Sequence, residues 1–354
     1  MSASSSPFAK RILNWFDKHG RHDLPWQTDK TPYRVWVSEI MLQQTQVSTV
    51  TPYYQRFMER FNTVQDLAAA ETDQVLHLWT GLGYYARARN LHNAAKTIAE
   101  THAGKFPQSV EGLMELSGIG QSTAGAIAAI SMDIRAPILD GNVKRVLTRY
   151  HAIDGWPEQS ATKKELWAIA ESLTPEKRAG DYTQAIMDLG ATVCTRSSPA
   201  CKNCPLQTDC LAHNQNRISE FPGKKEKKTL PVKSVAMFIL QNNSNAVLLE
   251  KRPATGIWGS LYSLPESADS NTLPNIPATM QTTASLSKAE QLTNIRHSFS
   301  HYHLEITPIR LPAGNNSPEV AETDRWLWYP LDHSLEVGLA APVKKLLSQL
   351  ANKP

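Results

Sequence analysis

The sequence predicts a multidomain protein in which an all-helical N-terminal domain is followed by an α+β domain. Three observations lead to this prediction. Apolar residues recur at three- and four-residue steps from Pro7 to about Cys210, which is the period of helices packed against a core. Between His213 and Pro231 the composition changes to Asn, Gly, Pro and Lys. After Pro231, short apolar runs are separated by turn residues, as in strands.

The chain of 354 residues is long enough for two domains that each bury their own core. We expect the first domain at residues 1–212 and the second at residues 232–354. The segment 213–231 between them contains the basic run 224–228 and is typical of a solvated linker.

In the first domain the helical period is clear in two places. Phe8, Ile12 and Phe16 fall on one face of a helix, and so do Val75 and Trp79. Strand-like alternation is hard to find before the linker. We therefore expect helices throughout this domain.

In the second domain the apolar runs 234–240 and 246–250 are separated by a turn-rich Asn-Asn-Ser-Asn segment, which predicts a β-hairpin. The stretches 304–311 and 326–329 also have strand character. Residues 342–350 have the pattern of a closing helix. Strands combined with a terminal helix predict an α+β domain.

Composition excludes some classes of protein. No stretch approaches the roughly 20 continuous apolar residues of a membrane helix, so we expect no membrane partner. The N-terminus, residues 1–7, is Ser-rich and lacks the basic start and apolar run of a signal peptide, which favours a cytoplasmic protein. The formal charge of +4 is compatible with a polyanionic partner and does not demand one.

All four cysteines lie in one short segment, with six residues between Cys194 and Cys201, two before Cys204 and five before Cys210. Thiols clustered this tightly favour a metal site over disulfides. Four thiolates in one loop can enclose a cubane iron–sulfur cluster or a tetrahedral zinc, and the spacing leaves both open. A complete set of four ligands leaves no position for a substrate, so the predicted role is structural.

Gly118 and Gly120 directly precede a small-residue segment, 122–130, that we expect to be helical. Glycines at this spacing allow a tight turn whose backbone N–H groups point outward at the start of the helix. Such a turn can hold a phosphate without side-chain charge. A plain turn between two helices would have the same local sequence.

Two carboxyl groups are candidates for acid–base chemistry. Glu39 lies in a nearly continuous apolar segment, 35–42, so burial should raise its pKa and favour the protonated acid. Asp140 stands where a helix should begin, and the free N–H groups there should keep it ionised. An exposed helical Glu and a simple N-cap are the alternative interpretations.

Opposite pKa shifts in two carboxyls are the pattern of an acid paired with an electrostatic stabiliser. Cleavage of a purine from deoxyribose requires such a pair. Protonation makes the base a neutral leaving group, and a fixed carboxylate stabilises the oxocarbenium-like sugar.

Together the motifs resemble those of the helix-hairpin-helix DNA glycosylases, which include endonuclease III, and within them the adenine-removing branch. The resemblance extends over nearly the whole chain. The residues that carry it are Leu24–Trp26, Ser38–Gln46, Leu78–Asn90, Leu116–Gly125, Leu139–Val146 and the four cysteines.

The resemblance implies a helix-hairpin-helix glycosylase domain with a [4Fe-4S] cluster on the four cysteines. It implies that Glu39 is the acid acting on adenine, that Asp140 stabilises the transition state, and that Gln44 and Tyr84 lie at the opened base pair. A planar amide or an aromatic ring can fill the gap that a flipped base leaves, although Tyr84 could instead belong to a core. Further candidates for DNA or base contacts are Gly118, Gly120, Ser122, Asn142, Lys144 and Asp188.

One position separates the branches of this family. Endonuclease III-like enzymes that also cut the strand carry a lysine in the hairpin helix as Schiff-base nucleophile, and Ser122 occupies that position here. A serine cannot form the imine. The expected chemistry is removal of the base by water, which leaves an abasic site.

The second domain resembles the Nudix-like domain of the same branch, with Gly256–Gly259 and Leu261–Pro265 as the matching strings. Nudix hydrolysis depends on paired glutamates that hold magnesium, and residues 266–290 contain no such run. We therefore expect no hydrolase activity from this domain.

Residues Phe299, Ser300 and His301 begin a string, 299–303, that matches the lesion-recognition loop of the family. The resemblance implies that this loop reads 8-oxoguanine opposite adenine. Alternating strand residues with an exposed histidine are the alternative interpretation.

The predicted function is that of a monofunctional DNA glycosylase in base excision repair, which excises adenine paired with 8-oxoguanine or guanine. Its expected partner is double-stranded DNA with such a mispair, and we expect a monomer associated with a bacterial-type nucleoid. Three rivals remain. An endonuclease III-like glycosylase and lyase is disfavoured by Ser122, and a zinc-stabilised DNA-binding protein would not explain Glu39 and Asp140. A nucleotide pyrophosphohydrolase lacks its glutamates.

Overall fold

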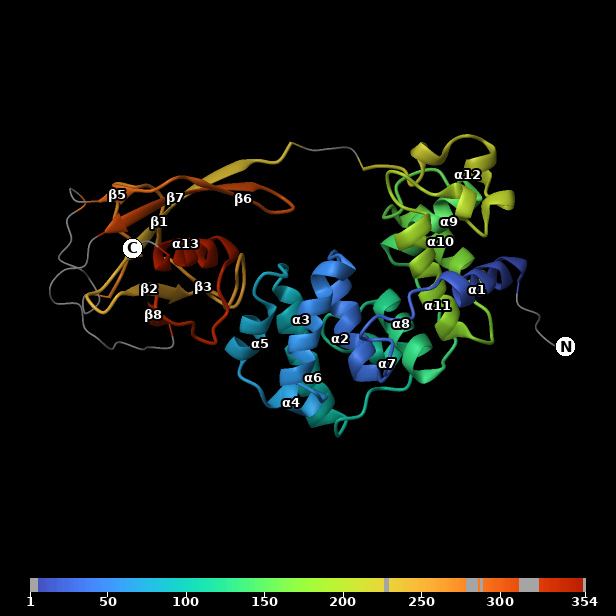
Figure 1. Ribbon diagram of the computed structural model, residues 1–354, viewed down its shortest axis with the longest axis horizontal. Coiled ribbons are helices and arrows are strands. Elements are labelled where there is room, and N and C mark those ends of the chain that lie inside the picture. The colour runs from blue at the N-terminus through green and yellow to red at the C-terminus, as the bar shows by residue number, and fades with distance from the viewer. Residues whose placement is uncertain (1–5, 226–228, 278–285, 287–288, 312–324, 353–354) are drawn as a thin grey trace. The chain divides into compact units, whose positions relative to one another are not determined.

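The contacts of the computed structural model divide the chain into two compact units (Figure 1). The first unit comprises Met1–Ala69 and Asn90–Lys227, and the second comprises Ala70–Arg89 and Lys228–Pro354. The short segment 70–89 thus groups with the C-terminal part of the chain, although it lies early in the sequence. The structure describes residues 6–225, 229–277, 286, 289–311 and 325–352.

The first unit is helical, which confirms the prediction for the N-terminal domain. Short 3₁₀ turns at Cys201–Asn203, Gln207–Asp209 and Ile218–Glu220 follow a π-helical turn at Leu189–Val193. The helices are α1 (Pro7–His19), α2 (Pro32–Leu42), α3 (Val47–Arg60), α4 (Val64–Ala69), α6 (Ala86–Thr101), α7 (Val110–Met114), α8 (Gln121–Met132), α9 (Gly141–His151), α10 (Ser160–Leu173), α11 (Ala179–Asp188) and α12 (Leu211–Asn214), where the first turn of α6 belongs to the second unit.

Local sequence determines where several of these helices begin. The Ser6 side chain accepts a hydrogen bond from the Ala9 amide at the start of α1, and the Thr31 side chain caps α2 in the same way. A proline follows each of these caps, at a position where a helix needs no amide donor. Asp140 caps α9 and is therefore fixed in place by the backbone it stabilises.

Small residues let other elements approach α8 closely. A side-chain carbon at Gly125 would lie 2.4 Å from the Pro137 carbonyl, and one at Gly180 on α11 would lie 2.5 Å from the Ala129 carbonyl. Only glycine fits at either contact. The helix after the glycine hairpin is therefore packed directly against the segment leading to Asp140 and against α11.

The second unit contains two sheets with a shared core of alternating apolar side chains. The core includes Phe238, Leu248, Ile309 and Trp328. Its helices are α5 (Thr72–Trp79) and α13 (Ala341–Ala351). Its strands are β1 (Val232–Leu240), β2 (Ala246–Lys251), β3 (Tyr262–Ser263), β4 (Glu266–Ser267), β5 (Glu290–Gln291), β6 (Ile295–Ser298), β7 (His303–Leu311) and β8 (Trp326–Pro330).

One sheet has the strand order β4-β1-β7-β5, with β6 also paired to β7, and the other has the order β3-β2-β8. β1 and β7 run parallel in a register that pairs Val232 with His303 and Leu240 with Leu311. The other pairs are antiparallel. The α+β prediction is confirmed, and α13 matches the helix expected at residues 342–350.

The predicted hairpin between the first two strands is confirmed only at its turn, where an antiparallel bridge pairs Gln241 with Val247. β1 pairs with β4 and β7, whereas β2 pairs with β3 and β8 in the other sheet. Because both strands are buried over most of their length, each needs its own sheet partners, and the turn at 242–245 carries the chain from one sheet to the other. The turn was therefore predicted correctly, whereas the strands beyond this bridge pair with other partners.

Some sequence features fall outside the described residues. These are most of the Ser-rich N-terminus, at 1–5, the end of the basic run, at 226–228, and part of the segment without Nudix glutamates, at 278–285 and 287–288. Within the part of the chain that the structure describes, no helix is both long and apolar enough to cross a membrane.

Candidate active site and cysteine loop

An open cavity of about 1020 Å³ in the first unit is bordered by the end of α2 and by the N-termini of α8 and α9. Both predicted catalytic carboxyls, Glu39 and Asp140, line it. Ligand pockets commonly have volumes of a few hundred to about 1,000 Å³, so a whole nucleotide fits in this space.

Glu39 lies on the face of α2 that borders this cavity, between the buried residues Ser38 and Ile40. No hydrogen bond to its carboxyl occurs among the residues that the structure describes. Burial, and secondarily the nearby charge of Asp140, raises the pKa of Glu39 to about 8. Glu39 is therefore protonated at neutral pH, as its apolar sequence context predicts.

Asp140 is held by its role as the N-cap of α9. Its carboxylate accepts a hydrogen bond of 2.7 Å from the Val143 amide and one of 3.1 Å from the Asn142 side-chain amide. Burial nevertheless raises the pKa of Asp140, and these hydrogen bonds oppose that shift. The prediction of opposite pKa shifts is therefore wrong, because burial beside the same cavity raises the pKa of both carboxyls.

The two carboxyls still differ in a way that separates their roles. Hydrogen bonds from Val143 and Asn142 favour the ionised form of Asp140, and Glu39 has no comparable donors. An ionised Asp140 then makes a second negative charge at Glu39 unfavourable. Of the two carboxyls, Glu39 therefore holds a proton more readily than Asp140.

The glycine hairpin joins α7 to α8 beside this cavity. Gly118 has a φ of 80°, and a side-chain carbon there would lie 2.7 Å from Cβ of Asn90. Nothing lies within 4 Å of the corresponding position at Gly120, the N-cap of α8, so the backbone there is open to a ligand. Ser122 lines the cavity, and its hydroxyl accepts a hydrogen bond of 3.0 Å from the Leu139 amide, next to Asp140.

The other predicted DNA-contact residues are distributed differently. Gln44 and Asn142 line the cavity, and Gln44 is exposed with a left-handed φ of 59°. Lys144 does not line it and instead forms an ion pair with Glu158. Asp188 is fully buried, and its carboxylate accepts hydrogen bonds from Arg21 and Gln184.

Sequence reasoning missed several polar residues of the cavity, and two of them share one buried partner. Arg21 and Gln184 both line it, and both donate hydrogen bonds to the buried Asp188, at 2.6 Å and 2.9 Å. Asp188 therefore orients donors toward the site rather than contacting a ligand itself. The signal that could have found Gln184 is its position one helical turn before Asp188.

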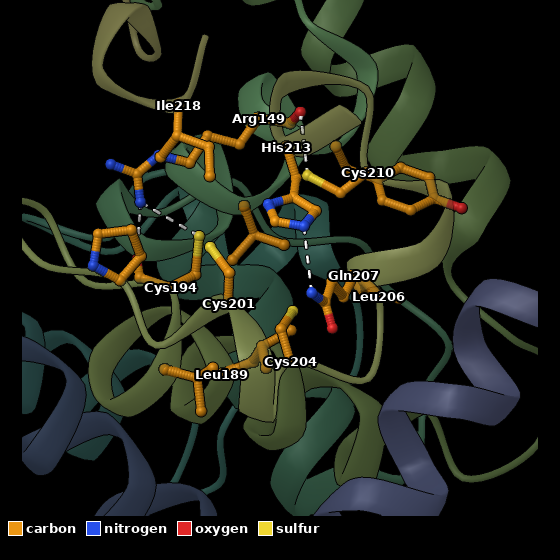
Figure 2. A pocket seen from close by; sticks show the side chains of 14 residues that line it. Arg149, Leu189, Cys194, Cys201, Cys204, Leu206, Gln207, Cys210, His213 and Ile218 are labelled. Carbon is orange, nitrogen blue, oxygen red and sulfur yellow. Dashed lines mark hydrogen bonds between the residues drawn. The ribbon is translucent and has the colours of Figure 1, made fainter. Parts of the chain in front are cut away.

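The four cysteines border a second, small cavity of about 30 Å³, and Figure 2 shows their sulfurs around a common space. The cavity wall is mainly apolar and includes Leu189, Val193 and Leu206. Among the described residues, no group of three or more His, Cys, Asp or Glu side chains is arranged around a single small metal ion.

Burial raises the pKa of the thiols of Cys201, Cys204 and Cys210, and that of Cys204 reaches about 12. Thiols in such a setting stay protonated unless a cation compensates the thiolates. The buried Arg149 supplies one donor, because its guanidinium lies 3.4 Å from the Cys194 sulfur (Figure 2). This donor set fits a metal cluster that takes thiolate ligands.

In the second unit, Tyr84 lies on the loop between α5 and α6. Its side chain is 52% exposed and its φ is 48°, between Gly83 with a φ of 72° and the start of α6. A large exposed aromatic residue on a tightly turned backbone is unusual for a core residue. The structure thus disfavours the interpretation of Tyr84 as a core residue.

Phe299, Ser300 and His301 form the turn between β6 and β7. The Phe299 amide donates a hydrogen bond of 2.9 Å to the Tyr302 carbonyl, which closes the turn. Ser300 and His301 are exposed at its tip, whereas Phe299 is half-buried. We call residues 295–311 the recognition hairpin, after the role that the sequence predicts for its tip.

Comparison with known families agrees with this architecture. Residues 37–172 match the HhH-GPD superfamily of base excision DNA repair proteins, and residues 236–349 match the NUDIX domain. The first match contains Glu39, the glycine hairpin and Asp140. Fold and site therefore define the class: a helix-hairpin-helix DNA glycosylase joined to a Nudix-like domain.

Two solved structures share the helical fold. A thermostable thymine-DNA glycosylase superposes with a TM-score of 0.54 at 25% identity, covering 59% of this chain and 95% of that one. An endonuclease III trapped in a covalent intermediate with DNA superposes with a TM-score of 0.51 at 20% identity, covering 59% and 94%.

Relatives matched by sequence point to one activity within this class. The adenine DNA glycosylase of Buchnera aphidicola subsp. Acyrthosiphon pisum is 39% identical over 340 residues, which cover 96% of each chain. The Homo sapiens adenine DNA glycosylase is 43% identical over 222 residues, which cover 60% of this chain and 40% of the human one. This chain belongs to the adenine DNA glycosylase family. It is accordingly a base-excision-repair enzyme that hydrolyses N-glycosidic bonds.

Proposed function

We propose that this glycosylase removes adenine paired with 8-oxoguanine, and also with guanine, and leaves an abasic site. The observation that carries the proposal is the pair of carboxyls in one nucleotide-sized cavity. Glu39 holds a proton at neutral pH, and Asp140 accepts hydrogen bonds from the backbone and from Asn142 that favour its ionised form.

In this proposal Glu39 delivers its proton to the departing adenine, which leaves as a neutral base. The bond between that base and the sugar then breaks without building negative charge on nitrogen. Asp140 stabilises the positive charge that develops on the sugar, and its fixed position means that no reorganisation is needed during the reaction. Arg21 and Gln184 supply donors that can orient the flipped base.

Hydrolysis is favoured over strand cleavage by the lining of the cavity. A lyase needs a lysine amine that can form an imine with the sugar. Among the described residues that line the cavity there is no lysine, and Ser122 is engaged with the Leu139 amide. Water is thus the nucleophile that the proposal requires.

We also propose that Cys194, Cys201, Cys204 and Cys210 hold a [4Fe-4S] cluster. Four partly buried thiols around one cavity, with the Arg149 guanidinium as a donor, support this assignment. The cluster would fix the loop after α11, and no step of the reaction uses it. The Nudix-like domain is proposed to recognise DNA and not to hydrolyse nucleotides, because residues 266–290 lack paired glutamates.

The cluster assignment predicts iron and acid-labile sulfide in equal amounts, about four of each per chain. Cys204→Ser should lose this content and much of the thermal stability of the helical unit, because a buried metal site contributes directly to folding. The exposed Lys202→Ala in the same loop is the control and should keep both. Stoichiometric zinc without iron would exclude the cluster.

The test of lesion recognition compares single-turnover rates of adenine release opposite 8-oxoguanine and opposite guanine. Ser300→Ala combined with His301→Ala should slow the first reaction several-fold more than the second, because each lost hydrogen bond to a base edge contributes about 1 kcal/mol. The exposed pair Thr293→Ala and Asn294→Ala, just before β6, is the matched control. Equal slowing on both duplexes would remove the recognition role from the hairpin.

The proposed partner is a DNA duplex that a monomer binds, and such an enzyme is expected at the bacterial nucleoid. Backbone groups at Gly118 and Gly120 are proposed phosphate contacts, and Gln44 and Tyr84 are proposed to occupy the opened base pair. Asp188 and Lys144, both engaged with other residues, are no longer proposed as direct DNA contacts.

A further inference from the structure

The segment 70–89, which carries Tyr84, is attached to the C-terminal part of the second unit by polar contacts along its length. The Asp73 carboxylate pairs with the Lys251 ammonium at 2.8 Å. The Tyr85 hydroxyl donates to the Leu339 carbonyl at 3.2 Å. At the end of the segment, the Arg89 guanidinium donates to the Gly259 carbonyl at 2.7 Å.

The acceptor of the last contact lies in an unusually constrained loop. Trp258 and Ser260, on either side of Gly259, have φ values of 54° and 62°. A side-chain carbon at Gly259 would lie 2.4 Å from the Ala254 carbonyl. Residues keep such backbone angles only where their surroundings determine them tightly, so the Gly259 carbonyl has a fixed direction.

The same loop contacts the recognition hairpin. The Trp258 ring is 8% exposed and packs on His297 and Phe299, with ring centroids 5.5 Å and 5.4 Å away. His297 and Phe299 also pack on each other at 4.6 Å. Aromatic groups at these separations stabilise one another and restrict the motion of the strand that carries them.

A continuous path of contacts therefore runs from the exposed Tyr84 to the exposed tip of the hairpin. It passes along the first turn of α6 to Arg89, across the hydrogen bond to Gly259, and through the Trp258 ring to Phe299. Every residue in this path belongs to the second unit.

We propose that Arg89 and Trp258 are specificity-determining positioning residues, which hold Tyr84 and the recognition hairpin as one rigid body. This inference depends on the proposed function, in which the hairpin reads 8-oxoguanine and Tyr84 enters the opened base pair. Correct contacts at the tip then place Tyr84 for insertion, and a base that the tip does not fit leaves Tyr84 misplaced. Lesion recognition thereby acts on the step that exposes adenine.

The first measurement is the ratio of single-turnover rates opposite 8-oxoguanine and opposite guanine, made on the full chain. Arg89→Met keeps the length of the side chain and removes its donors, and Trp258→Leu keeps an apolar side chain and removes the ring. Each should lower the ratio about tenfold, as expected for loss of a charged hydrogen bond or of tight aromatic packing. The exposed Arg325→Met and the core substitution Trp326→Leu are matched controls, and both should keep the wild-type ratio.

A double-mutant cycle tests whether the residues act through the hairpin. Arg89→Met is combined with Ser300→Ala and His301→Ala, and the effects on the ratio are compared. If Arg89 acts through the hairpin, the protein with all three substitutions should have a rate ratio no lower than that of the less selective of the two proteins being combined. Simple addition of the effects would show that Arg89 acts independently of the hairpin and would overturn the proposal.

Placement of Tyr84 can be followed without turnover. In a Glu39→Gln background, 2-aminopurine next to the mispair reports unstacking of the duplex. The emission should be higher opposite 8-oxoguanine than opposite guanine, and Arg89→Met should remove that difference. An emission difference that persists in Arg89→Met would contradict the proposal. Equal slowing of adenine release from both duplexes by Arg89→Met would also contradict it, because that is the behaviour of a phosphate contact. If the unmodified protein has no preference for 8-oxoguanine, the proposed function itself fails, and the positioning role with it.

Discussion

Replacement of Glu39 by glutamine should lower the rate of adenine release by about 10²- to 10⁴-fold while duplex binding stays nearly unchanged. Glutamine has the same shape and cannot deliver a proton. Since the carboxyl has no hydrogen bond among the described residues, the substitution breaks none, and the fold should be retained. Single-turnover kinetics on a duplex with adenine opposite 8-oxoguanine measures the first quantity, and fluorescence anisotropy measures the second.

The control for this variant is Glu165→Gln, the same chemical change at an exposed position on α10. It should keep the wild-type rate. A Glu39→Gln protein with nearly full activity would show that another group protonates adenine.

The raised pKa of Glu39 also sets a pH dependence. A carboxyl with a pKa of about 8 is protonated below that pH and loses its proton above it. Because the acid form is the active one, the alkaline side of the pH profile should reflect this pKa. There kcat/KM should be constant below pH 8 and fall about tenfold per pH unit above it. A profile that falls already near the ordinary pKa of glutamate would contradict the burial of this group.

Replacement of Asp140 by asparagine should lower the rate by about 10²- to 10³-fold, the usual loss when a preorganised electrostatic stabiliser is removed. Asparagine still accepts the Val143 amide as an N-cap, so α9 should stay intact. The effect then reports the charge and not the fold. Circular dichroism and thermal unfolding verify that the helix is retained.

The same variant makes a second prediction, because the Asp140 charge contributes to the raised pKa of Glu39. Without that charge the pKa of Glu39 should fall, and the alkaline limb of the remaining activity should move to lower pH. Asp133→Asn, an exposed residue at the C-terminus of α8, is the matched control and should change neither rate nor pH limb. An unshifted limb would mean that the two carboxyls do not interact.

Removal of the whole C-terminal part is a poor test of lesion recognition in this protein. Residues 70–89 form hydrogen bonds and an ion pair with that part, through Asp73, Tyr85 and Arg89. Truncation would leave those groups without partners and would disturb Tyr84 together with the hairpin. Point substitutions at Ser300 and His301 separate recognition from chemistry more cleanly.

The sequence by itself determined the fold class, the cysteine set and the two carboxyls. Each depends on a local pattern: the helical period, four thiols in one loop, an acid in an apolar helix, and an acid at a helix start. Local patterns survive folding because neighbours along the chain remain neighbours in space. For this reason the N-cap role of Asp140 and the raised pKa of Glu39 were both predictable.

Only the tertiary structure decided properties that arise when distant segments meet. Burial in the shared cavity raises the pKa of Asp140, although its helix-capping hydrogen bonds act to lower it. No short stretch of sequence contains the residues that cause this burial. Asp188 is not available to contact a ligand, because it pairs with Arg21, which lies 167 positions away in the sequence. The sheet partners of β1 and β2, and the attachment of Tyr84's segment to the C-terminal part, likewise depend on long-range packing. Burial and pairing are set by the whole chain, and the local sequence limits only which groups are available for them.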